Sequence, residues 1–291
     1  MAKIQIVTDS AAHFANPHFA SQYPVTVIPN TVHIGGQRFQ EGIDLSNEDA
    51  MKLVLRDQAI PVVDSPTEAD FARVYRNLAS TCDGIISIHP SRKIYPSWSR
   101  AKAAAQHIAG QCEIEVIDSQ SLSAAQAMIV RAAVRLAEQD IEVEEAIRRV
   151  RGTIDRIYVV YYVEEINALL QNEILSSSHT ILGSMLEVKP FLSMDDGEFK
   201  PIEKVRTRIQ AIDRLVEFVV EFTEIEDVVI LQNKSYISDQ TRMLQDRLAI
   251  EFPGRHFPYT LYGPSLTALI GTEVTGIALL ESETEYVSDG F

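Results

Sequence analysis

The sequence predicts an α/β protein made of two α/β domains, the first with a mostly parallel sheet and flanking helices. Its 291 residues suffice for two domains that each bury a core. Short apolar runs alternate with helical patterns through the first half, which is typical of parallel βαβ units with right-handed crossovers. This alternation changes near residue 155. We therefore predict an N-terminal domain over 1–155, a C-terminal α/β domain over 156–281 and a disordered tail over 282–291.

In the first half, strands and helices are predicted in turn. Ser46 is expected to cap a helix over 46–57. Ser65 is expected to cap a helix over 65–80, with Pro66 at its first position and Glu68 completing a capping box. The segment 25–39 reads as strand, turn and strand, interrupted by a proline and a glycine pair. The other predicted elements are strands at 3–10, 84–89 and 113–119 and helices at 97–109 and 121–139.

The second half changes this order. A helix over 143–157 leads to a strong strand over 158–165. Within 181–204, two short strands are predicted about the turn Asp195-Asp196-Gly197. The remaining predicted elements are a helix at 205–222, a strand at 227–233, a helix at 240–252 and strands at 256–262 and 276–281.

Composition argues against several classes of function. The formal net charge of −15 is unsuited to nucleic acids and to anionic membrane surfaces, since both require basic residues. Two cysteines are too few for a disulfide framework or a zinc site, which fits a reduced cytoplasm. No apolar run reaches the length of a membrane span, and the first residues lack a signal-peptide block. We expect a cytoplasmic protein without a membrane span or a nucleic-acid partner.

Polar residues follow two of the predicted strands. Thr8, Asp9 and Ser10 end the first strand, and Asp118 and Ser119 end the strand at 113–119. Ligands of open α/β sheets bind beyond the carboxyl ends of the strands, so these residues are candidate ligand contacts in one shared crevice. Alternatively, they cap the segments that follow.

No motif indicates catalysis. The chain has neither a G-x-S-x-G elbow nor a Walker-type loop, and its seven histidines lack metal-ligand spacing. His89 and His179 are conceivable catalytic groups, although a lone histidine at a strand end is more often structural. We therefore expect no catalytic residues, no metal and no cofactor.

Lys204, Arg206 and Arg208 form a basic run at the start of a predicted helix, where the helix dipole disfavours cations. In an acidic chain this placement suggests pairing with acids of the other domain, or contact with an anionic ligand or partner. Structural pairing is the favoured interpretation.

Several segments together resemble the DegV family, over nearly the whole chain. The matching stretches are IVTDSAA at 6–12, VIP with IGGQRFQEGIDLS up to 46, DGIISIH at 83–89, VIDS at 116–119, LGSMLEVKPFLSMDDGEF at 182–199 and KVRTR at 204–208. The resemblance implies a fold similar to the lipid-carrying subunits of bacterial fatty acid kinase, with one long acyl chain buried between or within two α/β domains. It also implies that a separate kinase phosphorylates the carboxylate, so the carrier itself needs no catalytic residues.

The resemblance further implies where the lipid head group lies, and there this chain departs from the family pattern. A Thr-Ser-Gln-Pro-Ser segment reads VDSPT here, with Val63 and Asp64 at its first two positions. A Leu-Ser-Gly-Thr turn reads IYPS, with Tyr95 replacing its serine and Ser97 its threonine. A Gly-Thr-His-x-Gly-Pro-Gly segment aligns on TALIGTE, with Leu269 replacing its histidine.

These changes remove hydrogen-bond donors that a buried carboxylate needs. Val63 and Leu269 cannot donate, and an inward, ionised Asp64 would repel an anion, whereas Tyr95 and Ser97 can each donate one bond. Two interpretations remain: a neutral or differently headed lipid, or a pocket partly filled by Tyr95 that takes something smaller. Alternatively, the alignment slips locally and Asp64 faces solvent.

A further departure concerns the partner kinase. The family's Gly-Gly-Arg-Ile segment, whose arginine is implicated in docking, reads QNEI at 171–174. Glu173 reverses that charge, which would weaken docking on a surface matched to arginine. Either the partner has changed as well, or this protein serves no such kinase.

The preferred hypothesis is a non-catalytic protein that holds a long-chain fatty acid or related acyl ligand in a buried tunnel, for transport or presentation to a partner enzyme. An alternative is an enzyme or sensor that binds a small polar ligand near Asp9, Asp64 and Asp118. A third is an interaction protein with a collapsed pocket.

Overall fold

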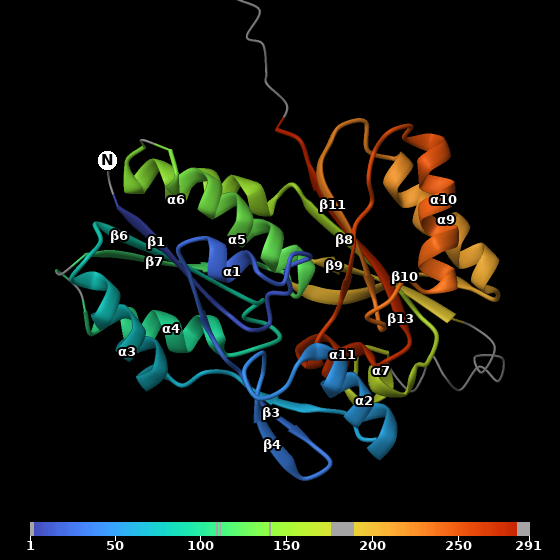
Figure 1. Cartoon of the computed structure of the whole chain (residues 1–291), viewed down its shortest axis with the longest axis horizontal. Coiled ribbons are helices and arrows are strands. Elements are labelled where there is room, and N and C mark those ends of the chain that lie inside the picture. Colours follow the sequence, from blue (N-terminus) through green and yellow to red (C-terminus); the bar gives the residue numbers. More distant parts are fainter. Residues whose placement is uncertain (1–2, 109, 111, 140, 176–188, 284–291) are drawn as a thin grey trace, which may run out of the picture.

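The structure is a computed structural model that describes residues 3–108, 110, 112–139, 141–175 and 189–283 (Figure 1). Its strands form a four-stranded, a six-stranded and a three-stranded sheet. The four-stranded sheet draws its strands from residues 4–118, and the six-stranded sheet draws its strands from residues 157–281. The two halves of the chain therefore each build one large sheet, and the predicted α/β class is confirmed.

The four-stranded sheet is parallel throughout, in the order β2-β1-β6-β7. Successive residues of its strands point to opposite sides, and apolar residues lie on both sides, so helices cover both faces of the sheet. Val7 and Ile85 pack under α3 and α4, whereas Ile6 and Ile86 pack under α5 and α6. The elements are β1 (Ile4–Asp9), α1 (Phe19–Gln22), β2 (Val25–Ile28), α3 (Glu68–Ala79), β6 (Gly84–His89), α4 (Ser97–Gln106), β7 (Glu113–Asp118), α5 (Ala124–Ala137) and α6 (Val143–Ile154).

The six-stranded sheet is mixed, in the order β10-β9-β8-β13-β11-β12, and only its β11–β12 pairing is parallel among the described strands. Helices α9 and α10 pack on one face, over Tyr162 and Ile230. The other face, with Tyr161 and Leu231, is turned toward α5 of the first half. The elements are β8 (Ile157–Val163), α7 (Asn167–Gln171), β9 (Lys189–Asp195), β10 (Glu198–Val205), α9 (Arg208–Val220), β11 (Ile225–Gln232), α10 (Asp239–Glu251), β12 (Tyr259–Leu261), α11 (Pro264–Ile270) and β13 (Val274–Glu281).

The small sheet, β4-β3-β5, is antiparallel and lies at the lower edge of the molecule in Figure 1, beside α2, α7 and α11. It consists of β3 (Thr31–Ile34), β4 (Gln37–Gln40) and β5 (Val62–Asp64), and α2 (Asn47–Asp57) packs on it. Helix α11 of the second half contacts both β5 and α2. The segment predicted as two strands over 25–39 therefore contains three, of which only β2 joins the large parallel sheet.

The predicted hairpin in the second half is confirmed. Strands β9 and β10 pair in antiparallel register and are joined by Asp196 and Gly197. Both turn residues have positive φ, 49° and 78°, as a two-residue hairpin turn of this hand requires.

Two predicted helix starts are wrong, that of α3 by two residues and that of α9 by three. The capping box of α3 is formed by Thr67 and Asp70, not by Ser65 and Glu68, because residues 65 and 66 are used to cross from β5 to the helix. Helix α9 begins at Arg208, since β10 continues to Val205 and Thr207 supplies the cap. The predicted cap of α2, Ser46, is confirmed.

Three short helices, α1, α7 and α11, were not expected from the sequence. The predicted division near residue 155 falls between α6, which ends at Ile154, and β8, which begins at Ile157. That the two halves are separate domains stays a prediction. The strand segment at 181–188, His179 and most of the predicted tail lie outside the described residues.

Candidate functional site

An apolar cluster lies between the two large sheets. The inner face of the six-stranded sheet contributes Tyr161, and Tyr95 of the first half is a buried member of the same cluster. Val63 of β5 and Leu269 of α11 pack against its edge, and their two elements contact each other. Three of the residues predicted for the head-group end, from three distant segments, therefore border one apolar region.

Tyr95 lies in the turn before α4, where its backbone N–H donates to the carbonyl of Ser91. Its hydroxyl donates a hydrogen bond of 2.8 Å to the carbonyl oxygen of Ser265. Burial and the nearby carboxyls of Glu41 and Asp9 raise the pKa of Tyr95 above its usual range. The Tyr95 hydroxyl is therefore a neutral donor at physiological pH.

Ser97 is the first residue of α4 and is fully buried. Its Oγ has no hydrogen-bond partner among the described residues. A buried hydroxyl left unpaired costs about 1–3 kcal/mol, so the Ser97 hydroxyl is suited to bind a ligand or an ordered water.

A buried carboxyl group that the sequence did not reveal lies next to Tyr95. Glu41 accepts hydrogen bonds from the hydroxyls of Ser10 (2.7 Å) and Ser265 (2.9 Å) and from the side-chain amide of Asn30 (2.9 Å). Burial raises the pKa of Glu41, and these three donors oppose that rise. An acid in the turn "QEGID" is expected to face solvent, so the sequence held no signal for this network.

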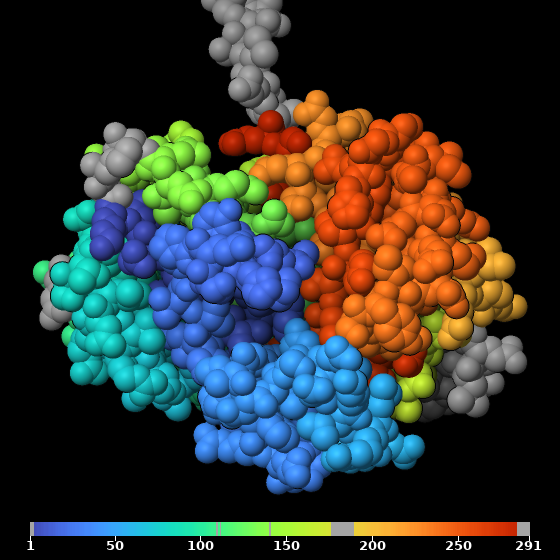
Figure 2. Space-filling view, viewed as in Figure 1, coloured from blue at the N-terminus to red at the C-terminus, as the bar shows by residue number. Residues whose placement is uncertain are grey.

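The Glu41 network also borders a cleft between the two halves. This cavity of about 760 Å³ is lined by Ser10, His13 and Glu41 from the first half and by Thr260 and Leu261 from the second. Figure 2 shows the surface hollowed between the blue N-terminal segments and the orange C-terminal part.

Asp9 belongs to a separate buried chain of hydrogen bonds. Its carboxylate lies 2.9 Å from Nδ1 of His89, whose Nε2 lies 2.7 Å from the hydroxyl of Ser87. Tyr75 donates to the same hydroxyl. The order of these groups resembles a catalytic triad, but Asp9, Ser87 and His89 are each 0% exposed, so the arrangement stabilises the sheet and gives a substrate no access.

Thr8 is also used internally. Its hydroxyl donates to the carbonyl of Ile88 and accepts from the side-chain amide of Gln126. Ser10 is bound to Glu41 and, of Thr8, Asp9 and Ser10, is the one that lines the cleft.

Asp64 faces away from the apolar cluster. Its side chain is 67% exposed and lies 3.2 Å from Nε2 of His33. Asp118 pairs with Arg92 at the surface. Asp64 lines a surface cavity that contains neither Asp9 nor Asp118, so the structure does not gather these three carboxylates into one crevice.

The basic run is divided between elements. Arg208 forms a bidentate ion pair with Glu164, with both N–O distances at 2.8 Å, and Lys189 binds the same carboxylate. This pairing lies within the second half, not across to the first half as predicted. Glu173 is exposed after α7 and has a positive φ of 57°.

Within the described ranges, no helix combines the length and the apolar character needed to cross a membrane. Over the same residues, His, Cys, Asp and Glu side chains nowhere gather in threes as a metal site would require.

Comparisons with known proteins identify the fold and the family. A family model described as an uncharacterised protein of the DegV family matches residues 3–282. A DegV domain-containing protein of Caldanaerobacter subterraneus is 30% identical over 255 residues, which cover 86% of this chain and 90% of that relative.

Two solved structures share the fold. A fatty acid binding DegV family protein from Streptococcus agalactiae gives a TM-score of 0.87 at 20% identity, covering 97% of this chain and 100% of that one. The B3 protein of the Streptococcus pneumoniae fatty acid kinase, loaded with linoleic acid, gives 0.81 at 15% identity, with 96% and 100% covered. Because the family model matches nearly the whole sequence, this chain belongs to the DegV family.

Proposed function

We propose that this protein is a non-catalytic carrier of a long-chain acyl lipid, whose chain lies in the apolar cluster between the large sheets and whose head lies near Tyr95 and Ser97. The observation that carries this proposal is that buried hydroxyl groups without a hydrogen-bond partner among the described residues occur within this cluster, at Tyr161, and two residues beyond its member Tyr95, at Ser97. The similar structures described as fatty acid binding or loaded with linoleic acid support it.

The cluster has the composition that an acyl chain requires. It combines aliphatic and aromatic side chains of both halves, including Leu122 and Met128 from one and Leu192 and Leu231 from the other. Burying an acyl chain there would gain about 0.8 kcal/mol per CH₂ group. Tyr161, a fully buried member, has a hydroxyl without a partner among the described residues, as Ser97 does. A bound polar group would relieve that cost.

The groups near Tyr95 favour a neutral head over a free carboxylate. Val63 and Leu269 offer no donor, and the Tyr95 hydroxyl is already used by Ser265. Ser265 in turn donates to Glu41, so an anionic head at this point would lie close to a buried acid. An ester, an alcohol or a protonated acid would avoid that repulsion.

Transport or presentation to a partner enzyme is the role we propose for the carrier, in the cytoplasm. Glu173 is exposed and available for docking, and its negative charge favours a basic partner surface. A partner whose surface is matched to arginine would bind Glu173→Arg more tightly than the native chain, and a basic partner would bind it less tightly.

Native mass spectrometry of freshly purified protein, followed by organic extraction and lipid identification, tests the proposal. We expect a lipid adduct with an acyl chain and a neutral head. A bound fatty acid would support the carrier role but assign the carboxylate to Tyr95 and Ser97. An adduct-free protein that takes up no lipid after feeding would overturn the proposal in favour of a small-ligand or partner-binding role.

A further inference from the structure

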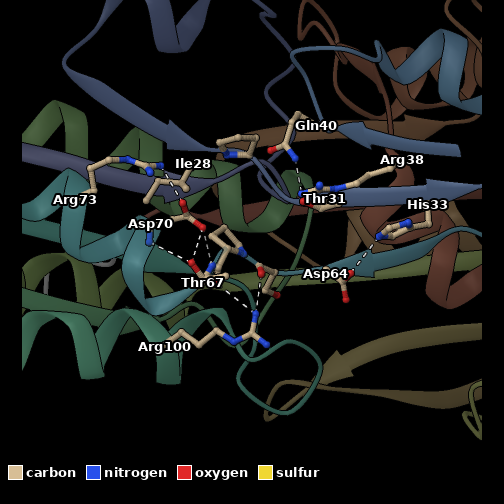
Figure 3. A pocket seen from close by; sticks show the side chains of 13 residues that line it. Ile28, Thr31, His33, Arg38, Gln40, Asp64, Thr67, Asp70, Arg73 and Arg100 are labelled. Atoms are coloured by element: carbon tan, nitrogen blue, oxygen red, sulfur yellow. Dashed lines mark hydrogen bonds and ion pairs between the residues drawn. The ribbon is translucent and has the colours of Figure 1, made fainter.

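A second cavity, distinct from the apolar cluster, lies at the surface between the small sheet and the helices α3 and α4 (Figure 3). Its volume is about 600 Å³, within the range of small-molecule sites. The lining residues are mainly polar, and they include Arg38, Asp64, Ser65, Asp70, Arg73 and Arg100.

Three arginines from three different elements surround this cavity. Arg38 comes from β4, Arg73 from α3 and Arg100 from α4, and Figure 3 shows them reaching it from different sides. In a chain whose formal net charge is −15, such a gathering of guanidinium groups is unexpected. Like charges repel, so guanidinium groups that line one cavity favour the binding of an anion between them.

The acids of the cavity pair with only one of these arginines, Arg73, among the described residues. Asp64 pairs with His33, and Asp70 is bound in the capping box of α3 while it also pairs with Arg73 at 2.9 Å. Arg38 and Arg100 form no ion pair with any described residue. Two of the three guanidinium charges therefore have no carboxylate partner in the described part of the chain.

Arg100 is held in place by the backbone. Its Nη1 donates to the carbonyl oxygens of Ser65 (2.7 Å) and Pro66 (3.3 Å). Its other donors, Nε and Nη2, have no bond to a described residue. A guanidinium fixed on one side and free on the other is preorganised to bind an oxyanion.

Ser65 adds an independent indication of a ligand. It lines the cavity, is 5% exposed, and its Oγ has no partner among the residues that the structure describes. An unpaired buried hydroxyl beside guanidinium groups suits an oxygen-rich anion, which can accept from both.

The cavity is separated from the proposed lipid site by one strand. Val63 and Asp64 are neighbours on β5 and point to opposite sides, Val63 to the apolar cluster and Asp64 to this cavity. A ligand in the cavity would therefore not replace the acyl lipid.

From this geometry we propose a second binding site, for a small soluble oxyanion of the phosphate or polycarboxylate class, held by Arg38, Arg73 and Arg100. Guanidinium groups bind both classes through paired N–H donors, and the three arginines that line the cavity exceed its two carboxylates, Asp64 and Asp70, by one positive charge.

Isothermal titration calorimetry of the whole protein in a phosphate-free buffer of low ionic strength tests this site, with pyrophosphate and citrate as the probes. We expect saturable binding of at least one probe, weakened about tenfold or more in Arg38→Gln and in Arg73→Gln. Binding of pyrophosphate alone would assign the phosphate class, and binding of citrate alone the polycarboxylate class.

Arg76→Gln is the matched control. Arg76 lies one turn along α3 from Arg73, is also exposed and does not line the cavity. Equal weakening in Arg76→Gln would show general charge attraction and overturn the site, as would the absence of saturable binding of both probes. The lipid content of Arg38→Gln should match that of the native protein, so this proposal and the lipid-carrier proposal can fail separately.

Discussion

The hydroxyl of Tyr95 and the carbonyl oxygen of Ser265 are joined by a buried hydrogen bond of 2.8 Å, although the residues lie 170 positions apart. The bond connects the turn before α4 to the first turn of α11, and thus the two halves of the chain. Since Ser265 also donates to Glu41, Tyr95 is part of the polar edge of the apolar cluster. The large side chain in this turn thus has both a structural role and a place beside the proposed lipid head.

Tyr95→Phe should lower the free energy of unfolding by about 1 kcal/mol, because the buried carbonyl of Ser265 loses its donor while the ring remains. Urea denaturation measures this loss. Tyr23→Phe is the control, since Tyr23 is exposed and its hydroxyl has no bond to a described residue. If both variants lost the same free energy of unfolding, the hydrogen bond from Tyr95 to Ser265 would not contribute measurably to stability.

The β9–β10 hairpin docks on the segment before α4, and Gly197→Ala should disturb that contact. The Ser91 hydroxyl donates to the carbonyl of Gly197 at 2.6 Å, and a Cβ at Gly197 would lie 2.5 Å from the same Oγ. Gly36→Ala is matched, because Gly36 also has a φ near 79° in a hairpin turn but its Cβ would meet open space. Both substitutions should lower the free energy of unfolding by about 1 kcal/mol, because alanine is strained in the left-handed backbone conformation. Gly197→Ala should lower it by at least about 1 kcal/mol more.

A double-mutant cycle identifies the source of that excess. In a Ser91→Ala background the clashing Oγ is absent, so Gly197→Ala should cost only about as much as Gly36→Ala. An excess that persisted in this background would place the strain elsewhere in the hairpin.

The alternation of strands and helices was enough to predict the fold class, since short apolar runs that alternate with helical patterns are typical of a parallel sheet covered by helices. Tyr95, Val63 and Leu269 were identified through resemblance and do border one cluster. Strand geometry could also have corrected one expectation. Neighbours on a strand point to opposite faces, so Val63 and Asp64 could not both face the same pocket.

Glu41 and the cavity arginines could not be found in this way. A carboxylate in a turn is exposed by default, and Glu41 is buried here because Ser265 from the other half of the chain meets it together with Ser10 and Asn30. Arg38, Arg73 and Arg100 each read as ordinary surface residues, because their convergence depends on how the small sheet packs beside α3 and α4. Such tertiary contacts leave no local pattern in the sequence.

The start of α3 gives a test of which residue caps the helix. Thr67→Ala should lower the free energy of unfolding by about 1 kcal/mol, because the Asp70 N–H loses the Thr67 hydroxyl. Ser65→Ala should cost less, since the Ser65 hydroxyl has no partner in the described chain. Thermal unfolding of both variants measures these losses of stability. A larger loss in Ser65→Ala than in Thr67→Ala would indicate that Ser65 caps the helix.

Acidification should destabilise the protein through His13. Burial lowers the pKa of His13 from 6.5 to about 4. Between these values the unfolded chain binds a proton that the folded chain does not, so the free energy of unfolding falls as the pH falls through this window. The loss would approach roughly 3 kcal/mol once the pH is near the lower value.

His13→Gln removes this titration, so its free energy of unfolding should fall less than that of the native protein between about pH 7.5 and about pH 4.5. Burial raises the pKa of Glu41. As the pH rises above the ordinary pKa of a glutamate, the unfolded chain therefore loses a proton that the folded chain keeps, and the free energy of unfolding falls. This trend is opposite to that of His13. Both proteins keep Glu41, and the difference between them isolates His13. His18→Gln, at an exposed histidine, should follow the native curve. Parallel curves for the native protein and His13→Gln would mean that His13 is protonated in the folded chain, stabilised there by Glu41, whose Oε1 lies 3.8 Å from its Nε2.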